Sequence, residues 1–268
     1  MNKTLLLYDF GPGVTAFSTT RRGGVSEGAY ASFNVNAYCG DHASHVSANR
    51  LQLCKHLGIS PEHLIIPHQT HQTQVRVIDE AFFQQTADER QASLEGIDAV
   101  LTDVPQTCIG VSTADCIPIL VYDNEHHAAA AIHAGWRGTV ARIAQVAVEA
   151  MSRSYASRPS ALHAIIGPGI GLDSFEVGDE VWQAFADADF PMSQLSRRYR
   201  AMQGGTGERW HIDLPACNRL QLLEAGVPPQ RVQLSAIDTW QQSETFFSAR
   251  RLGIHSGRIY SGIVLRPV

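Results

Sequence analysis

The stretch Ile117-Pro118-Ile119-Leu120-Val121-Tyr122, followed after a short polar turn by Ala128-Ala129-Ala130-Ala131-Ile132-His133, determines the fold class. Both runs have the length of a strand and are apolar almost throughout, without the alternation of a strand that has one wet face. This pattern is typical of strands covered on both faces. Further short apolar runs at 15–19, 74–78, 99–102, 107–111, 162–166 and 262–265 predict more strands.

Helical patterns lie between these runs. A helix is expected over 44–57, with Ser44 as its N-cap and Gly58 as the residue that ends it. Two more helices are expected over 139–151 and over 214–225, the latter capped by Asp213. Because strands and helices follow no strict strand–helix–strand rhythm, the sequence predicts a layered α/β or α+β sandwich, built as one domain over residues 1–268.

Composition excludes several classes of protein. The chain has 268 residues, of which 44% are hydrophobic and 18% charged, as in ordinary globular proteins. The net charge of −5 gives no indication of a positively charged surface that would bind nucleic acid or an anionic membrane. Twelve histidines make a metal site worth seeking. Composition leaves the oligomeric state open.

The cysteines point to a reducing compartment. Five cysteines, widely spaced and without a CxxC pair, do not form a disulfide framework. The N-terminal stretch lacks the long apolar run of a secretory signal, and no segment reaches the ~20 apolar residues of a membrane helix. A cytoplasmic protein is expected.

Two histidines and one cysteine stand at the ends of expected strands. His71 precedes one strand, Cys116 precedes another, and His133 closes a third. Two imidazoles and a thiolate suit zinc or copper and leave a fourth position open, but their spacing matches no standard metal motif. A buried structural Cys116 and a core His133 are an alternative, and a Cys116 nucleophile with a histidine base is another.

Arg137 lies in a turn flanked by glycines that leads into a helix. A guanidinium beside a helix N-terminus forms an anion site, for phosphate in particular. A structural ion pair with a carboxylate explains Arg137 equally well.

Taken together, several stretches resemble the laccase-domain family of bacterial multicopper-polyphenol-oxidase-like proteins, which includes bacterial purine nucleoside phosphorylases and the peptidoglycan editing factor. The matching stretches run in order along nearly the whole chain: 17–26, 31–34, 40–41, 49–50, 69–71, 113–118, 133–139, 166–168, 176–178 and 246–251. Gly169 and Asp238 depart from the family, whose members often have cysteine at these places.

The resemblance implies an α-β-β-α sandwich of mixed sheets, related to Cys-His toxin deamidases, with one zinc or copper ion on His71, Cys116 and His133. It also implies phosphorolysis of adenosine, inosine, guanosine or methylthioadenosine, and deamination of adenosine. The expected partners are therefore a purine nucleoside and phosphate.

The remaining site residues follow from that chemistry. Asp115 is the candidate for proton transfer. Arg137 and Arg250, with Arg22 behind them, are candidates for holding phosphate, because attack on the ribosyl carbon needs cationic groups that hold it in line. Ser32 and Asn34 are candidates for contacts with ribose or base, although turn capping explains both as well.

Three other functions remain open. One is copper-dependent polyphenol oxidation. The second is a Cys-His amidase or editing hydrolase acting on a peptidoglycan precursor, with Cys116 as nucleophile. The third is a metal-binding module without enzyme activity.

Overall fold

Strands β7 (Ile117–Asp123) and β8 (Ala128–Ala134) pair in antiparallel fashion at the centre of a six-stranded sheet. The structure is a computed structural model and describes residues 4–202 and 205–267. The strand order is β13-β9-β7-β8-β5-β4, and the outer strands are β13 (Val232–Leu234), β9 (Leu162–Ile166), β5 (Ala99–Thr102) and β4 (Val75–Ile78).

A second, five-stranded sheet has the order β1-β2-β14-β6-β3. Its strands are β1 (Leu5–Tyr8), β2 (Val14–Thr19), β14 (Ile259–Leu265), β6 (Cys108–Thr113) and β3 (Leu64–Ile65). The C-terminal strand β14 lies between β2 and β6 and is antiparallel to both.

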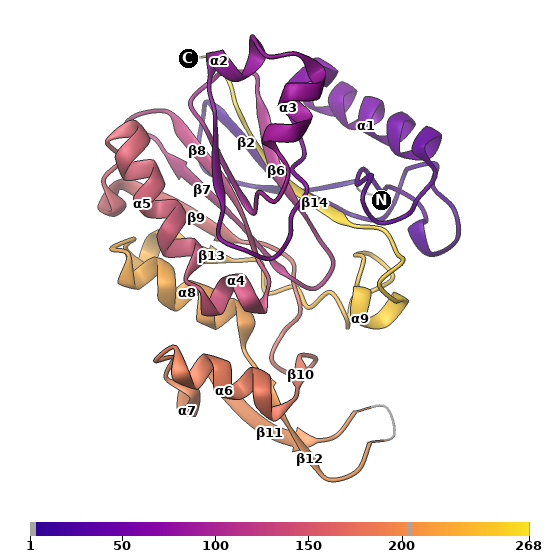
Figure 1. The fold of residues 1–268 in the computed structure, drawn as a ribbon, viewed down its shortest axis with the longest axis vertical. Coiled ribbons are helices and arrows are strands. Elements are labelled where there is room, and N and C mark those ends of the chain that lie inside the picture. The colour runs from indigo at the N-terminus through magenta and orange to yellow at the C-terminus, as the bar shows by residue number, and fades with distance from the viewer. Residues whose placement is uncertain (1–3, 203–204, 268) are drawn as a thin grey trace.

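The two sheets pack face to face, and helices cover their outer faces (Figure 1). Leu120 and Ala131 of the first sheet meet Ile109 and Ile263 of the second in the core between the sheets. On the far face of the six-stranded sheet lie α5 (Ile143–Tyr155) and α8 (Leu214–Glu224), and α1 (Ala43–Leu57) covers the five-stranded sheet. These layers confirm the predicted sandwich of mixed sheets and explain why β7 is apolar on both faces.

A smaller three-stranded sheet projects from the sandwich as an arm (Figure 1). It consists of β10 (Glu176–Val177), β12 (Glu208–Ile212) and β11 (Ser196–Arg200), with α6 (Asp179–Asp187) and α7 (Met192–Leu195) beside it. The remaining helices are short: α2 (Glu80–Phe83), α3 (Ala87–Ser93), α4 (Trp136–Val140) and α9 (Ala249–Leu252).

The structure corrects two of the expected helices. The helix expected over 139–151 is two helices, α4 and α5, because Arg142 adopts a left-handed conformation with φ 62° and breaks the run. Helix α1 begins at Ala43 with His42 as its N-cap, so Ser44 is not the cap, but Gly58 ends the helix with φ 63° as expected. Asp213 caps α8 as predicted, its side chain accepting a hydrogen bond from the amide of Ala216. Among the described residues, no helix is long and apolar enough to span a membrane.

Candidate functional site

The three predicted metal ligands come from separate segments that meet at one end of the sandwich. Cys116 directly precedes β7, and His133 lies near the end of β8; the antiparallel register that pairs Pro118 with His133 puts these two positions side by side. His71 lies in the loop between β3 and β4 and has a φ of 63°.

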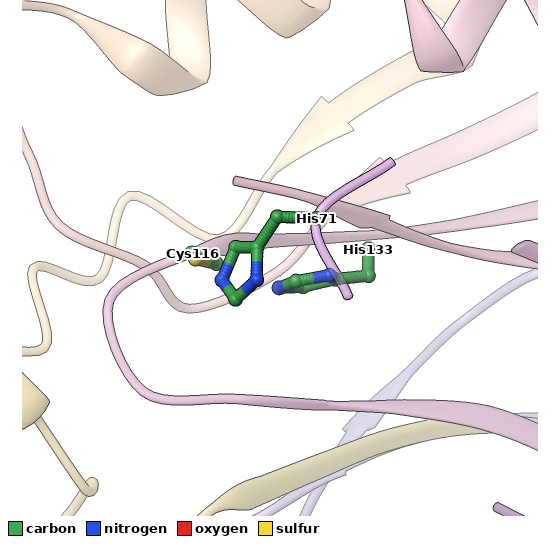
Figure 2. A group of neighbouring side chains, drawn as sticks. All are labelled: His71, Cys116 and His133. Carbon is green, nitrogen blue, oxygen red and sulfur yellow. The ribbon is translucent and has the colours of Figure 1, made fainter. Parts of the chain in front are cut away.

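The donor atoms of these side chains point toward one another (Figure 2). The sulfur of Cys116 and one ring nitrogen from each of His71 and His133 all lie within 4.8 Å of one another. The two imidazole rings are 4.8 Å apart between centroids and meet at 71°. The structure thus brings together the three residues that the sequence analysis proposed as ligands. Along the chain, His71 and Cys116 are 45 residues apart, and Cys116 and His133 are 17 residues apart.

A buried carboxylate holds two of these segments in place. Asp98 has no exposed surface, and its Oδ1 accepts hydrogen bonds from His133 Nδ1 at 2.7 Å and from the His71 amide at 3.0 Å. Its Oδ2 accepts hydrogen bonds from the amides of Gln72 at 2.8 Å and Thr70 at 3.2 Å. Burial alone would raise the pKa of Asp98, but the hydrogen bond and charge of His133 and these backbone amides lower it below its usual value.

In the metal-free protein the cysteine and one histidine form an ion pair. Burial raises the pKa of the Cys116 thiol, but the charge of His133 and hydrogen bonds to His133 and His71 outweigh it and lower that pKa to about 6. Burial alone would lower the pKa of His133, but the Cys116 charge and the bonds to Asp98 and Cys116 raise it to about 9. Cys116 is therefore a thiolate at neutral pH, the form that binds metal and attacks electrophiles.

The donor set fits a transition metal. Zinc bonds of ~2.0–2.3 Å place tetrahedral ligands about 3.5 Å apart, so small movements of side chains within the 4.8 Å limit suffice to bind one ion. Gly135 keeps this space open, because a Cβ there would lie 2.8 Å from His71 Cδ2 and 3.0 Å from Cys116 Sγ. Three protein ligands with room for a fourth is the pattern of catalytic zinc sites.

The three ligands line a cavity of about 980 Å³. The residues that line its other walls include four with aromatic rings and two arginines: Tyr38, His68, Trp136, Phe175, Arg250 and Arg258. The Tyr38 and His68 rings stack at 4.1 Å between centroids. The cavity therefore combines a soft metal-binding group with flat apolar surfaces and positive charge.

Asp115 and Arg250, both predicted site residues, also line this cavity and are joined to each other. Asp115 has φ 85°, and its Oδ2 accepts a hydrogen bond from the Arg250 amide at 2.6 Å. Its Oδ1 accepts a hydrogen bond from Thr239 Oγ1 at 2.7 Å. The Arg250 guanidinium donates to the carbonyl oxygen of Glu176 in the arm and lies 5.7 Å from the centre of the Phe175 ring.

Arg137 and Arg22 do not line the cavity. The exposed Arg137 guanidinium lies 4.3 Å from the ring centre of Trp136, which does line it. Arg22 donates to Thr245 Oγ1 at 3.2 Å. Of the three predicted phosphate-holding arginines, the structure therefore places Arg250 at the cavity.

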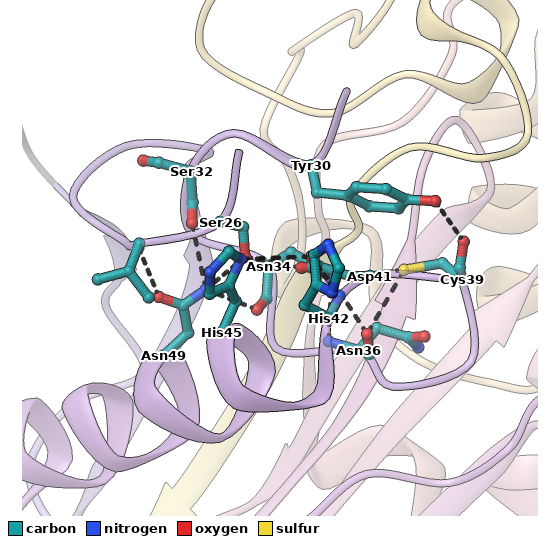
Figure 3. Close-up of polar contacts among 11 residues, drawn as sticks. Ser26, Tyr30, Ser32, Asn34, Asn36, Cys39, Asp41, His42, His45 and Asn49 are labelled. Carbon is teal, nitrogen blue, oxygen red and sulfur yellow. Dashed lines mark hydrogen bonds and ion pairs between the residues drawn. The ribbon is translucent and has the colours of Figure 1, made fainter. Parts of the chain in front are cut away.

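Ser32 and Asn34 do not line the cavity either, because both hold the loop around them (Figure 3). Ser32 Oγ donates to the Arg21 carbonyl and accepts from the Gly24 amide. The fully buried Asn34 donates to Asp41 Oδ2 at 2.9 Å. These contacts favour the alternative for both residues, in which the side chains cap and hold turns of the chain.

Several residues of the site were not predicted from the sequence, among them Asp98 and His68. Asp98 follows Gly96-Ile97 and directly precedes an expected strand, a position like those of the three ligands, and that position was the available signal. His68 lies three residues before His71 and is part of no motif in the sequence. In the structure it lines the cavity and lies 2.6 Å from Glu95 through its Nδ1.

Comparisons with known proteins identify the relatives of this chain. A family model described as multi-copper polyphenol oxidoreductase laccase matches residues 15–266. A purine nucleoside phosphorylase of Bacteroides thetaiotaomicron is 47% identical over 252 residues, 94% of this chain and 92% of that protein. Adenosine deaminase RL5, from an unknown prokaryotic organism, is 46% identical over 251 residues, 94% of each chain.

Solved structures agree as well. The crystal structure of Bacillus licheniformis hypothetical protein YfiH superposes with a TM-score of 0.86 at 28% identity, covering 98% of this chain and 97% of that one. YlmD from Geobacillus stearothermophilus gives a TM-score of 0.84 at 30% identity, covering 96% and 93%. The resemblance seen in the sequence is thus confirmed, and the chain belongs to the multi-copper polyphenol oxidoreductase laccase family.

Proposed function

We propose that this chain is a metal-dependent purine nucleoside enzyme. It cleaves adenosine, inosine, guanosine or methylthioadenosine with phosphate, and it deaminates adenosine. The observation that carries the proposal is the convergence of His71, Cys116 and His133 at a cavity large enough for a nucleoside and phosphate. The names of two relatives at 46–47% identity support the two reactions.

His71, Cys116 and His133 would hold one zinc or copper ion per chain. Such an ion supplies a Lewis acid that activates water or polarises a substrate oxygen. Phenol oxidation by copper generally uses several copper centres, whereas only one of the two groups of described residues that could hold an ion, His71, Cys116 and His133, contains cysteine; the other is Asp123, Glu125 and His126. All five cysteines are free thiols, and we place the protein in the reducing cytoplasm.

The cavity walls supply the contacts that a nucleoside and phosphate need. The rings of Trp136 and Phe175, and the stacked pair Tyr38 and His68, offer flat faces to a purine base. Arg250 holds phosphate by charge-assisted hydrogen bonds while a phosphate oxygen bonds to the ribosyl carbon and the glycosidic bond breaks. The electron pair of that bond leaves with the base, which gains a proton.

Asp115 is the proposed site of proton transfer. Its two oxygens each accept one hydrogen bond, from Thr239 and from the Arg250 amide, and this holds the carboxylate in a fixed orientation at the cavity wall. Each oxygen keeps a lone pair for a proton of the substrate. The same contact couples the carboxylate to the residue that binds phosphate.

Incubation of metal-assayed protein with adenosine, with and without phosphate, tests the proposal. Adenine and ribose 1-phosphate in the presence of phosphate indicate phosphorolysis, and inosine indicates deamination. Cys116→Ser and His133→Ala should abolish both metal binding and turnover. Zinc-loaded protein that yields neither product set would refute the purine assignment.

A second candidate function is a Cys-His amidase on a peptidoglycan precursor. It is favoured by one observation, the thiolate of Cys116 paired with His133 in the metal-free protein. A metal chelator separates the two functions, because it should stop the nucleoside reactions and leave a thiol amidase active.

A further inference from the structure

Asp98 touches both histidines of the proposed metal site, although it is not itself a ligand. It receives four hydrogen bonds, one from the imidazole of His133 and three from consecutive backbone amides at Thr70, His71 and Gln72. Its own backbone carbonyl accepts the His133 amide at 2.8 Å. One fully buried residue therefore holds the His133 side chain, the His133 backbone and the loop that carries His71.

We propose that Asp98 is a positioning residue that sets both histidine ligands, an inference that rests on the metal site proposed above. A carboxylate only accepts hydrogen bonds, so the hydrogen of a neutral His133 must sit on Nδ1, which faces Asp98. The lone pair is then on Nε2, which is free to bind the ion. Outer partners of this kind fix the tautomer and ring orientation of histidine ligands.

The same carboxylate shapes the loop of the second ligand. His71 has φ 63°, a left-handed conformation that a residue with a side chain seldom adopts without support. The amides on both sides of it and its own amide point at Asp98. The three bonds stabilise this turn and so fix where the exposed His71 ring enters the site.

An amide cannot replace this carboxylate. In Asp98→Asn the side chain keeps its size but offers one acceptor oxygen to four donors. If the amide oxygen takes the place of Oδ2 and keeps the Thr70 and Gln72 amides, the NH₂ group faces His133 Nδ1 and the His71 amide, and it forces the hydrogen of His133 onto Nε2. If the side chain flips, the NH₂ group opposes the Thr70 and Gln72 amides and loosens the loop that carries His71.

The chain offers a matched control in Asp123. This residue is also fully buried and also accepts hydrogen bonds from two backbone amides, those of Glu125 and His126. It accepts another from His126 Nδ1 at 2.8 Å. Asp123 ends β7, at the opposite end of the strand from Cys116, so Asp123→Asn removes a comparable network outside the proposed site. Asp123, Glu125 and His126 are themselves close enough to hold an ion, so the comparison uses the affinity of the tightest zinc site, measured with at most one equivalent of zinc.

The test is the zinc affinity of purified protein, measured by competition with a chromophoric chelator and without nucleoside. Asp98→Asn should bind zinc about 10- to 100-fold more weakly than the unmodified protein, whereas Asp123→Asn should stay within about threefold. Equal affinity for Asp98→Asn and the unmodified protein, or an equal loss in both variants, would overturn the inference. Circular dichroism of both metal-free variants establishes that the proteins compared are folded.

A second measurement determines which ring nitrogen of His133 carries hydrogen, and it needs no substitution of Asp98. In zinc-loaded protein labelled with ¹⁵N, the His133 ring, assigned with His133→Gln, should carry its hydrogen on Nδ1 and the metal on Nε2. Metal on Nδ1 would overturn the inference even if Asp98→Asn failed to fold. Neither measurement uses turnover, so Asp98 can fail this test while the nucleoside reactions stand, and the reverse also holds.

Discussion

Gly135→Ala should weaken metal binding while the fold is retained. The added Cβ would lie 2.8 Å from His71 Cδ2 and 3.0 Å from Cys116 Sγ, whereas carbon atoms normally approach to ~3.5 Å. The ligands must therefore retreat by roughly 0.5–0.7 Å, well beyond the ~0.2 Å tolerance of metal–ligand distances. Backbone strain plays no part, because Gly135 has φ −70°, which alanine adopts readily.

The added methyl group should weaken zinc binding and leave the stability of the metal-free protein unchanged. In the metal-free protein the exposed His71 ring can swing away from the methyl group, but metal binding requires it to return. Overpacking of this kind costs about 1–3 kcal/mol, which corresponds to a roughly 10- to 100-fold weaker zinc affinity. Chelator competition measures the affinity, and thermal unfolding of the metal-free protein measures the stability.

Gly138→Ala is the control in the same segment. A Cβ there meets Gln72 O at 3.3 Å and Ile143 Cγ2 at 3.4 Å, contacts that a few tenths of an ångström relieve, and it faces no ligand atom of the site. This variant should bind zinc as the unmodified protein does. Unchanged affinity in Gly135→Ala, or an equal loss in both variants, would refute the reasoning.

Three further outcomes are expected. The rate at which iodoacetamide alkylates Cys116 of the metal-free protein should rise with pH around a midpoint near pH 6, and His133→Ala should raise that midpoint. A midpoint near pH 9 in the unmodified protein would contradict the ion pair between Cys116 and His133. The depressed pKa of Cys116 contributes stability that is lost as pH falls toward 6, and the raised pKa of His133 contributes stability that is lost as pH rises through about 9. Because Cys116→Ser removes the contribution that is lost toward low pH, the difference in unfolding free energy between the metal-free protein and Cys116→Ser should shrink as pH falls from about 9 through about 6, and urea titrations that show no such decrease would disprove it. Arg250→Gln should raise the KM for phosphate about tenfold or more, whereas Arg137→Gln should raise it less than about twofold. Phosphate-dependent release of adenine measures this KM, and a larger increase for Arg137→Gln would show that the wrong arginine was assigned.

Much of the layer structure was predictable from the pattern of apolar residues along the chain. The apolar runs at 117–122 and 128–133 indicated strands covered on both faces, and they lie between the inter-sheet core and the helices. The break at Arg142 was not predictable, because neither glycine nor proline marks it. It is held by tertiary contacts, since the Arg142 guanidinium donates to Glu224 and to the carbonyl of Ala188.

Some residues of the site were likewise predictable from the sequence, and others were not. His71, Cys116 and His133 were recognisable by their chemistry and by the family motifs around them. Asp98 was not, because a carboxylate before a strand resembles any turn residue and its partners lie 26 to 35 residues away. For Ser32 and Asn34 two roles stayed open, because sequence does not distinguish polar side chains that hold a loop together from those that face a ligand.

The position of β14 has a consequence for synthesis on the ribosome. The last strand of the sandwich fills the middle of its sheet, between β2 and β6, and β6 leads directly into the turn that carries Asp115 and Cys116. Until residues 259–265 leave the exit tunnel, the nascent sheet has a gap at its centre and β6 lacks the neighbour with its most extensive pairing. A polypeptide truncated before this strand would contain all three candidate ligands and still be unable to hold them in place, so the metal should be acquired only after residues 259–265 have been synthesised and paired.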